Sequence, residues 1–148
     1  MPSIETATKT DAGLAAELRL SVVRLRRRLI GERDPENDLS LGAMAVLGCL
    51  YRRGPLQIGE LASLERVRPP SMTRTVTGLE ADGYVERRPH ESDARLVVVH
   101  LTDKGEATLL VDRKRRDAWL ACQLRELSSD ERAVLRAAAP ILEKLAAS

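Results

Sequence analysis

Apolar residues recur at helical spacing near both ends of the chain. Near the start, five of them follow one another at steps of three or four residues, which places them on one face of a helix of about five turns. They are Leu14, Leu18, Val22, Leu25 and Leu29. Near the end, Ser128 and Glu131 form the S-x-x-E pattern that opens helices. The apolar face of the helix that follows carries Val134, Ala138, Ile141 and Leu145.

The middle of the chain predicts three shorter helices separated by turns. Ser40 is a good N-cap for the first, which ends near residues 53–55. The second covers residues 58–65, and the third covers residues 69–81 and starts with two prolines, which suit the first turn of a helix. The inward positions of the first are Met44, Leu47 and Leu50, and those of the third are Met72, Val76 and Leu79.

A β-hairpin is predicted after the third of these helices. Residues 84–86 read as one strand and the β-branched run 96–101 as its partner, joined by a charged turn over residues 87–95. Thr102 and Asp103 then cap a long helix that runs to about residue 126. The predicted fold is therefore mainly α with a small hairpin wing: a winged helix-turn-helix lobe at about residues 39–102, with further helices at about 10–30 and 103–147.

Composition and motifs narrow the class of protein. The chain has 148 residues, 43% hydrophobic and 31% charged, which is typical of one globular domain. Its two cysteines, Cys49 and Cys122, form no zinc or dithiol motif. Because hydrolase, zinc-protease and P-loop motifs are absent, we expect that the protein is not an enzyme and that it binds no cofactor or metal. The polar start of the chain does not resemble a signal peptide, and the uncharged run 39–51 is too short to span a bilayer, so we expect a cytoplasmic protein.

The polar face of the helix at 69–81 is a candidate DNA-reading surface. In a helix-turn-helix the second helix enters the major groove, and short hydroxyl side chains together with an arginine can bond base edges or phosphates there. Ser71, Thr73, Arg74 and Thr77 lie on this face, with Arg66 and Arg68 at the entry to the helix. In the predicted turn, arginines are placed to reach a minor groove, whose negative potential attracts them. They are Arg87, Arg88 and Arg95.

An ordered set of motifs resembles the MarR family of bacterial transcriptional regulators. The set comprises Leu39-Ser40, IGELA at 58–62, PPSMTR at 69–74, LEADGYVERR at 79–88, D-x-R at 93–95 and LTDKG at 101–105. The resemblance implies a homodimer that reads a palindromic operator in double-stranded DNA and is released by a small aromatic or anionic ligand. It assigns Arg95 to the minor groove and Asp93 to bracing the wing. The sequence departs from the family pattern at Arg68 and Gln57, which stand where capping residues are usual, and at Gly78 inside the recognition helix.

Two sets of residues carry these expectations. The DNA-binding candidates are Arg68, Ser71, Thr73, Arg74, Thr77, Arg88, Asp93 and Arg95. The dimerisation candidates are Leu14, Leu18, Val22, Leu25, Val134, Ile141 and Leu145. A lobe of this size cannot easily cover both terminal stripes, so a second subunit is the economical partner. The alternative is that the two terminal helices pack on each other within one chain.

Other functions remain open on the sequence alone. Residues 61–100 hold six arginines and six acidic residues, so a winged-helix module that binds protein and not DNA is a second hypothesis. A thiol redox switch is a third, although both cysteines are expected to pack inside the protein. The effector site is not defined, with Trp119, Met44 and Cys49 as candidates for its lining. The basic runs at 24–28 and 113–116 suit an anionic ligand or flanking DNA, and equally a solvated helix face.

Overall fold

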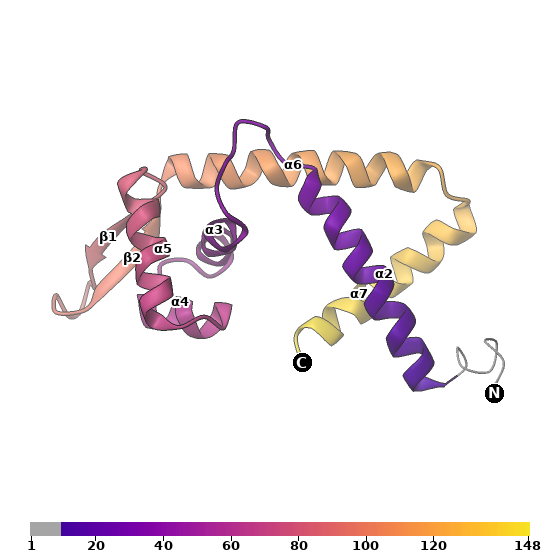
Figure 1. Ribbon diagram of the computed structural model, residues 1–148, viewed down its shortest axis with the longest axis horizontal. Helices are drawn as coiled ribbons and strands as arrows, with labels where there is room; N and C mark the ends of the chain where they lie inside the picture. Colours follow the sequence, from indigo (N-terminus) through magenta and orange to yellow (C-terminus); the bar gives the residue numbers. More distant parts are fainter. Residues whose placement is uncertain (1–9) are drawn as a thin grey trace. The chain divides into compact units, whose positions relative to one another are not determined.

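The computed structural model describes residues 10–148 and forms six helices and one two-stranded sheet within that range (Figure 1). The interpretation of the first residues as unlike a signal peptide falls on residues 1–9, which lie outside the described range. No helix in the described part is long and apolar enough to cross a membrane. The elements in chain order are α2 (Asp11–Gly31), α3 (Leu41–Arg53), α4 (Ile58–Glu65), α5 (Pro69–Ala81), β1 (Val85–Pro89), β2 (Val97–Leu101), α6 (Asp103–Arg125) and α7 (Ser129–Ala146).

The chain divides into two compact units. One unit, called the lobe here, covers residues 34–113 and holds α3, α4, α5, the hairpin and the start of α6. The other is formed by the residues before 34 together with residues 114–148. All the buried hydrophobic side chains of the described residues lie in the lobe, so the lobe contains the core.

Helix α3 forms the centre of that core, as its apolar pattern predicts. The hydroxyl of Ser40 accepts a hydrogen bond from the Ala43 N–H at 3.1 Å and begins the helix. Met44, Leu47 and Leu50 are all buried, and Leu47 is completely so. They pack with the inward face of α5, where Met72, Val76 and Leu79 are at most 2% exposed. Burial of such side chains contributes roughly 1.5–3 kcal/mol each.

Helices α4 and α5 have the bounds that the sequence predicts. A Glu60 carboxylate oxygen accepts a hydrogen bond from the Gln57 N–H at 3.2 Å, so the start of α4 is capped although Gln57 replaces a better cap. Arg66 follows α4 in the left-handed conformation, with φ of 55°. Its own N–H donates to the Ser63 carbonyl at 3.3 Å. This tight turn sends the chain into α5.

The wing, residues 85–101, is an antiparallel hairpin whose first strand is longer than predicted. The expectation of a turn starting at residue 87 is wrong, because Arg87, Arg88 and Pro89 continue β1 and pair with Val99, Val98 and Val97. The pairing is dictated by the valine run of β2, whose far side is also held by two backbone hydrogen bonds between Val99 and Leu56, at 2.7 and 3.2 Å. The tip projects away from helices α3 to α5 (Figure 1).

A buried carboxylate fastens the loop before α3 to helix α6 inside the lobe. Asp112 is 0% exposed, and its two oxygens accept hydrogen bonds from the Asp34 N–H at 2.9 Å and from the Asn37 amide at 2.8 Å. The Asn37 oxygen in turn accepts from the Leu39 N–H at 3.0 Å. The loop therefore has a defined conformation despite its polar composition.

Both terminal helices are capped, α7 by the predicted Ser128–Glu131 pair, but neither buries any of its residues in the single chain. Thr10 caps α2, and at the start of α7 Ser128 and Glu131 bond each other's backbone N–H groups at 2.8 and 3.1 Å. The Arg28 guanidinium lies over the Trp119 ring, 5.2 Å from its centre, and so connects α2 with the second half of α6.

Candidate nucleic-acid interface

Helix α5 presents a polar face because its apolar face is fixed in the core. With Met72, Val76 and Leu79 buried, the residues on the other side are left in solvent. Ser71, Thr73, Arg74 and Thr77 are exposed there, as is Arg68 immediately before the helix. Arg68 makes no side-chain cap, and Pro69 and Pro70 start the helix in its place. The structure thus brings five of the eight DNA-binding candidates onto one helix face and its entry.

The hydroxyl groups on this face differ in their present partners. Thr73 donates its hydroxyl hydrogen to the Pro69 carbonyl at 3.0 Å, which leaves its oxygen able to accept. The Thr77 oxygen already accepts from an Arg87 Nη atom at 3.0 Å, and its hydrogen is left to donate. Ser71 lies at the helix start, where backbone N–H groups favour an anion such as phosphate.

A clamp between Glu80 and Arg87 joins α5 to the wing. One Glu80 oxygen accepts from the Arg87 backbone N–H at 2.8 Å, and the other accepts from its guanidinium at 2.7 Å. The backbone bond chiefly, followed by the guanidinium bond, lowers the pKa of Glu80 below its ordinary value. Because Arg87 also reaches Thr77, one side chain ties the wing to the polar face of α5. This role for Arg87 and Glu80 was not predicted.

The tip of the wing holds a single, well-oriented arginine. Arg95 is 90% exposed, and its Nε and Nη2 atoms donate to the two Asp93 oxygens at 3.1 and 3.3 Å. Asp93 also accepts from the Arg95 backbone N–H at 3.0 Å, so the carboxylate fixes both the backbone and the side chain. The side-chain bond first, and the backbone bond after it, lower the pKa of Asp93. Arg88 is paired with Glu86 on the same strand as Arg87.

The base of the wing is held by Thr102, which caps α6 as predicted, and by Lys104. Thr102 donates its hydroxyl to the Gly83 carbonyl at 2.6 Å and accepts from the Gly105 N–H at 3.1 Å. Lys104 donates to the Asp82 carbonyl at 2.6 Å and lies over the Tyr84 ring at 4.4 Å. Together these contacts attach the first turn of α6 to the turn between α5 and β1. The sequence predicts the cap by Thr102, whereas the bonds to the Gly83 and Asp82 carbonyls join residues 19 and 22 positions apart and have no local signal.

Comparison with known proteins places this geometry in a family. The family model for MarR matches residues 39–97, which include α3, α4, α5, β1 and the start of β2. An HTH-type transcriptional regulator of Mycobacterium leprae, itself uncharacterized, is 41% identical over 136 residues, which are 92% of this chain and 94% of that protein. The chain belongs to the MarR family.

Solved structures have the same fold. A MarR family protein from Bacillus stearothermophilus superposes with a TM-score of 0.81 over the full length of both chains, at 23% identity. Streptococcus pneumoniae FabT, solved in complex with DNA, superposes with a TM-score of 0.70 over 89% of this chain and 95% of that one, at 21% identity. The winged helix-turn-helix fold predicted from the sequence is therefore confirmed.

The dimerisation candidates of this MarR chain are apolar side chains in contact with solvent. On α2, Leu14, Leu18, Val22 and Leu25 are between 37% and 49% exposed, and on α7 Val134, Ile141 and Leu145 are between 59% and 66% exposed. Such extended apolar faces are unusual on the solvent-exposed surface of a monomeric protein. These side chains stay exposed in the single chain. The structure therefore gives no support to the alternative in which the two terminal helices bury each other's apolar faces within one chain.

The two cysteines have different environments. Cys49 is 1% exposed in the core, as predicted, and burial raises the pKa of its thiol, which makes it a poor nucleophile. The expectation that Cys122 packs inside the protein is wrong for the single chain, since it is exposed. The second half of α6 carries no buried residue after Asp112, and Cys122 there accepts a hydrogen bond from the Arg125 guanidinium at 2.8 Å.

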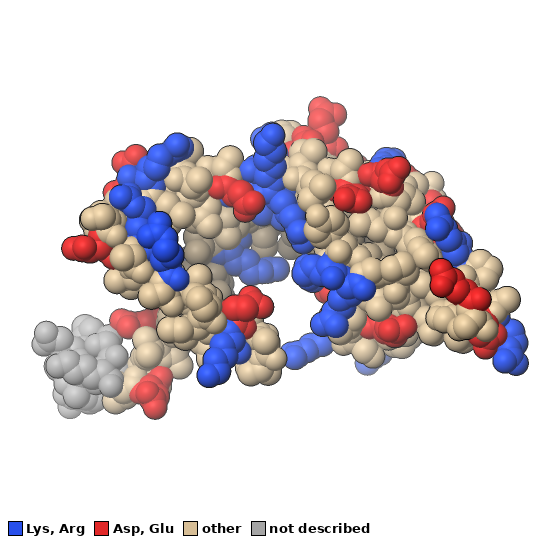
Figure 2. Space-filling view, turned by 180° about the vertical axis from the view of Figure 1, so that it is seen from behind, with Lys and Arg blue, Asp and Glu red and all other residues tan. Residues whose placement is uncertain are grey.

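Charges of both signs share the surface of this MarR chain. Figure 2 shows lysine and arginine interspersed with aspartate and glutamate over the face that it presents. The net charge of +2 agrees with this mixture. Attraction to nucleic acid must therefore come from the placement of particular arginines and not from overall charge.

Proposed function

We propose that this chain is a sequence-specific transcriptional regulator that binds a palindromic operator as a homodimer. The observation that carries the proposal is the exposed face of α5, with Ser71, Thr73 and Arg74, beside an arginine at the wing tip that Asp93 orients. Short hydroxyl side chains allow a helix to approach base edges closely, and arginine suits both guanine edges and a narrow minor groove. The regulator from M. leprae and the DNA complex of FabT support this role.

Two arginine variants test the assigned contacts. Arg74→Ala and Arg95→Ala should each weaken operator binding by about 1–3 kcal/mol. Loss of Arg74 should relax discrimination between base pairs, whereas loss of Arg95 should weaken binding most where A·T-rich flanks narrow the minor groove. Fluorescence anisotropy on the operator and on single-base variants, at fixed salt, measures both effects. Arg136→Ala, on α7, is the matched control and should bind like the parent protein.

The second hypothesis, a winged-helix module that binds protein and not DNA, predicts no affinity for nucleic acid. A DNA-reading dimer neutralises several phosphates, so its affinity should fall steeply with salt and it should be retained on heparin or bulk DNA at low salt. If the protein passes through both columns unretained, the DNA-binding proposal fails. If it is retained but both arginine variants bind the operator like the parent, the assigned contacts are wrong.

The homodimer in this proposal rests on the terminal helices. Helices α2 and α7 bury nothing in one chain while exposing leucines, valines and isoleucines along a face of each. A second copy that covers both faces removes this apolar area from water, at roughly 25 cal/mol per Å². A twofold dimer also presents two copies of α5, which is what a palindromic operator requires.

Release by a small aromatic or anionic ligand, and hence action as a repressor, completes the proposal. Trp119 is the single tryptophan of the chain, and Arg28 lies over its ring, so an aromatic face and a cation stand together on α6 and α2. Titration with small phenols and carboxylates should change the Trp119 fluorescence saturably and reduce operator affinity in parallel. If neither signal changes across the panel, the ligand part of the proposal is wrong while DNA binding is unaffected.

A further inference from the structure

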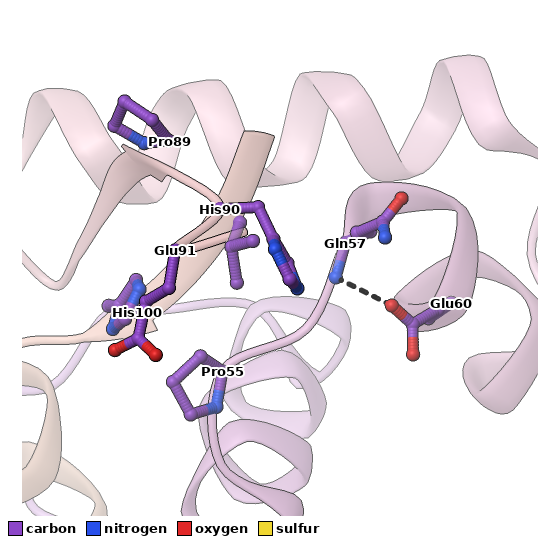
Figure 3. A pocket seen from close by; sticks show the side chains of 8 residues that line it. Pro55, Gln57, Glu60, Pro89, His90, Glu91 and His100 are labelled. Atoms are coloured by element: carbon purple, nitrogen blue, oxygen red, sulfur yellow. Dashed lines mark hydrogen bonds between the residues drawn. The ribbon is translucent and has the colours of Figure 1, made fainter. Parts of the chain in front are cut away.

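A cavity lies between the wing and the start of α4. Its volume is about 430 Å³, which is within the range of small-molecule sites. Pro55 and Gln57 line it from the segment before α4, and His90 and Glu91 line it from the turn after β1 (Figure 3). Every lining residue belongs to the lobe, so the cavity exists in one chain.

Part of the cavity wall is apolar and rigid. Pro55 and Pro89 contribute their rings, which lock the backbone φ angle at these two residues. Val98 contributes a side chain that is only 7% exposed. Val98 is held in place by its pairing with Arg88 across the hairpin. These three residues can contact the apolar body of a ligand without having to be ordered by it.

The charged groups of the cavity are both acidic. Glu60 and Glu91 line it, and no lysine or arginine does so among the described residues. One Glu60 oxygen accepts from the Gln57 N–H, as Figure 3 shows, and the other oxygen has capacity for a further donor. Glu91 is exposed and lies at the hairpin turn. Two carboxylates without a lining cation favour a positively charged ligand.

The imidazoles of His90 and His100 complete the lining. His90 Nδ1 accepts from the Ser92 backbone N–H at 3.1 Å, so in the neutral ring the proton is on Nε2. The described residues contain no group of three or more histidine, cysteine or acidic side chains able to hold a metal ion. The positive charge is therefore better supplied by an organic cation than by a metal.

We propose that this cavity binds a small organic cation with an apolar body, such as an amidinium or ammonium group carried on a ring. Glu91 receives the cation, and Pro55, Pro89 and Val98 contact the ring. This site is separate from the terminal helices and does not depend on DNA binding, because neither is needed to form it.

The test uses benzamidine as a probe and the two histidines as reporters. His90 and His100 are the only histidines of the chain, so their imidazole signals in a proton NMR spectrum report on this cavity alone. Benzamidine should shift both signals saturably, with a Kd on the order of 1 mM. Benzamide and benzoate have nearly the same shape with no charge or a negative charge, and each should bind at least about fivefold more weakly.

A pair of variants distinguishes binding of benzamidine in the cavity from a general effect of the protein's charge. Glu91→Gln should weaken benzamidine binding by about three- to fivefold, as expected for an ion pair near solvent. Glu143→Gln, on α7, removes the same charge elsewhere and should leave binding unchanged. The proposal is overturned if benzoate binds as well as benzamidine, if Glu91→Gln binds like the parent, or if the histidine signals do not move. None of these outcomes concerns DNA, so the regulator proposal stands or fails separately.

Discussion

At Gly105 there is no space for a side chain. A Cβ atom there would overlap the carbonyl oxygen of Tyr84 and lie 2.7 Å from the Leu101 Cδ1 atom. The Tyr84 carbonyl cannot retreat easily, because it accepts the Thr102 N–H at 3.2 Å. The absence of a side chain at Gly105 therefore lets α6 start against the base of the wing.

Gly105→Ala should lower the free energy of unfolding by about 1–3 kcal/mol or more, because backbone has to shift to admit a methyl group. Urea unfolding followed by circular dichroism measures the change. Gly59→Ala, in α4, is the control: a Cβ there meets nothing within 4 Å. Since alanine favours helix over glycine by up to about 1 kcal/mol, the control should be neutral or stabilising. Equal destabilisation by both substitutions would contradict the close packing at Gly105.

The candidate interface could be predicted from sequence where helix periodicity decides exposure. Ser71 and Arg74 are exposed because they lie opposite buried positions of the same helix, which the spacing alone reveals. The bond between Thr77 and Arg87 could not be predicted, because it joins residues ten positions apart across a turn. Whether each candidate contacts DNA stays a prediction.

Two elements, α5 and β1, are held together by one carboxylate. As a carboxylate, Glu80 accepts two hydrogen bonds from Arg87, one from its guanidinium at 2.7 Å and one from its backbone N–H at 2.8 Å. Its lowered folded-state pKa means that this contribution to stability is complete above about pH 4.3, the ordinary value for glutamate. The contribution is lost as the pH falls through the lowered value.

Glu80→Gln should therefore lower the melting temperature at about pH 7, and the difference from the parent should shrink at about pH 3. Thermal unfolding at both pH values measures it. Glu106→Gln, on the exposed side of α6, is a control that should show no such pH-dependent difference. A Glu80→Gln deficit of the same size at both pH values would show that the ionised clamp does not stabilise the fold.

The elements that the sequence predicted well are those bounded by local signals. Helix α5 begins at two prolines and ends before Asp82-Gly83, and both limits can be read in the sequence. Strand β1 was predicted too short because Arg87, Arg88 and Pro89 have no alternation of apolar and polar residues. Their extended conformation comes from pairing with the valines of β2, which is information outside the segment itself.

At the scale of the whole molecule, the proposed homodimer would cover the exposed apolar faces of α2 and α7. Sedimentation at micromolar concentration should give twice the 16.3 kDa chain mass. Ile141→Glu places a charge on the α7 face, where the side chain is 61% exposed in one chain. The variant should dimerise at least about 100-fold more weakly, which corresponds to about 2.7 kcal/mol, because its carboxylate would be buried at the interface.

The control for this experiment is Ala139→Glu, which adds the same group to the opposite side of α7 by helical periodicity. It should sediment like the parent. A parent protein of 16.3 kDa, or an Ile141→Glu variant that keeps its mass but melts earlier, would support packing of the two helices within one chain. At this scale the sequence predicted the apolar stripes, but their spacing does not reveal what covers them.

The clamp between Glu80 and Arg87 has a consequence for redesign. Exchanging only residues 69–81 for a helix that has no carboxylate at the position of Glu80 would remove the acceptor that holds Arg87 and the first wing strand against α5. A transplant that carries 69–101 as one cassette keeps both partners of the clamp. Engineering a new operator preference in this scaffold therefore has to treat helix and hairpin as a single exchangeable part.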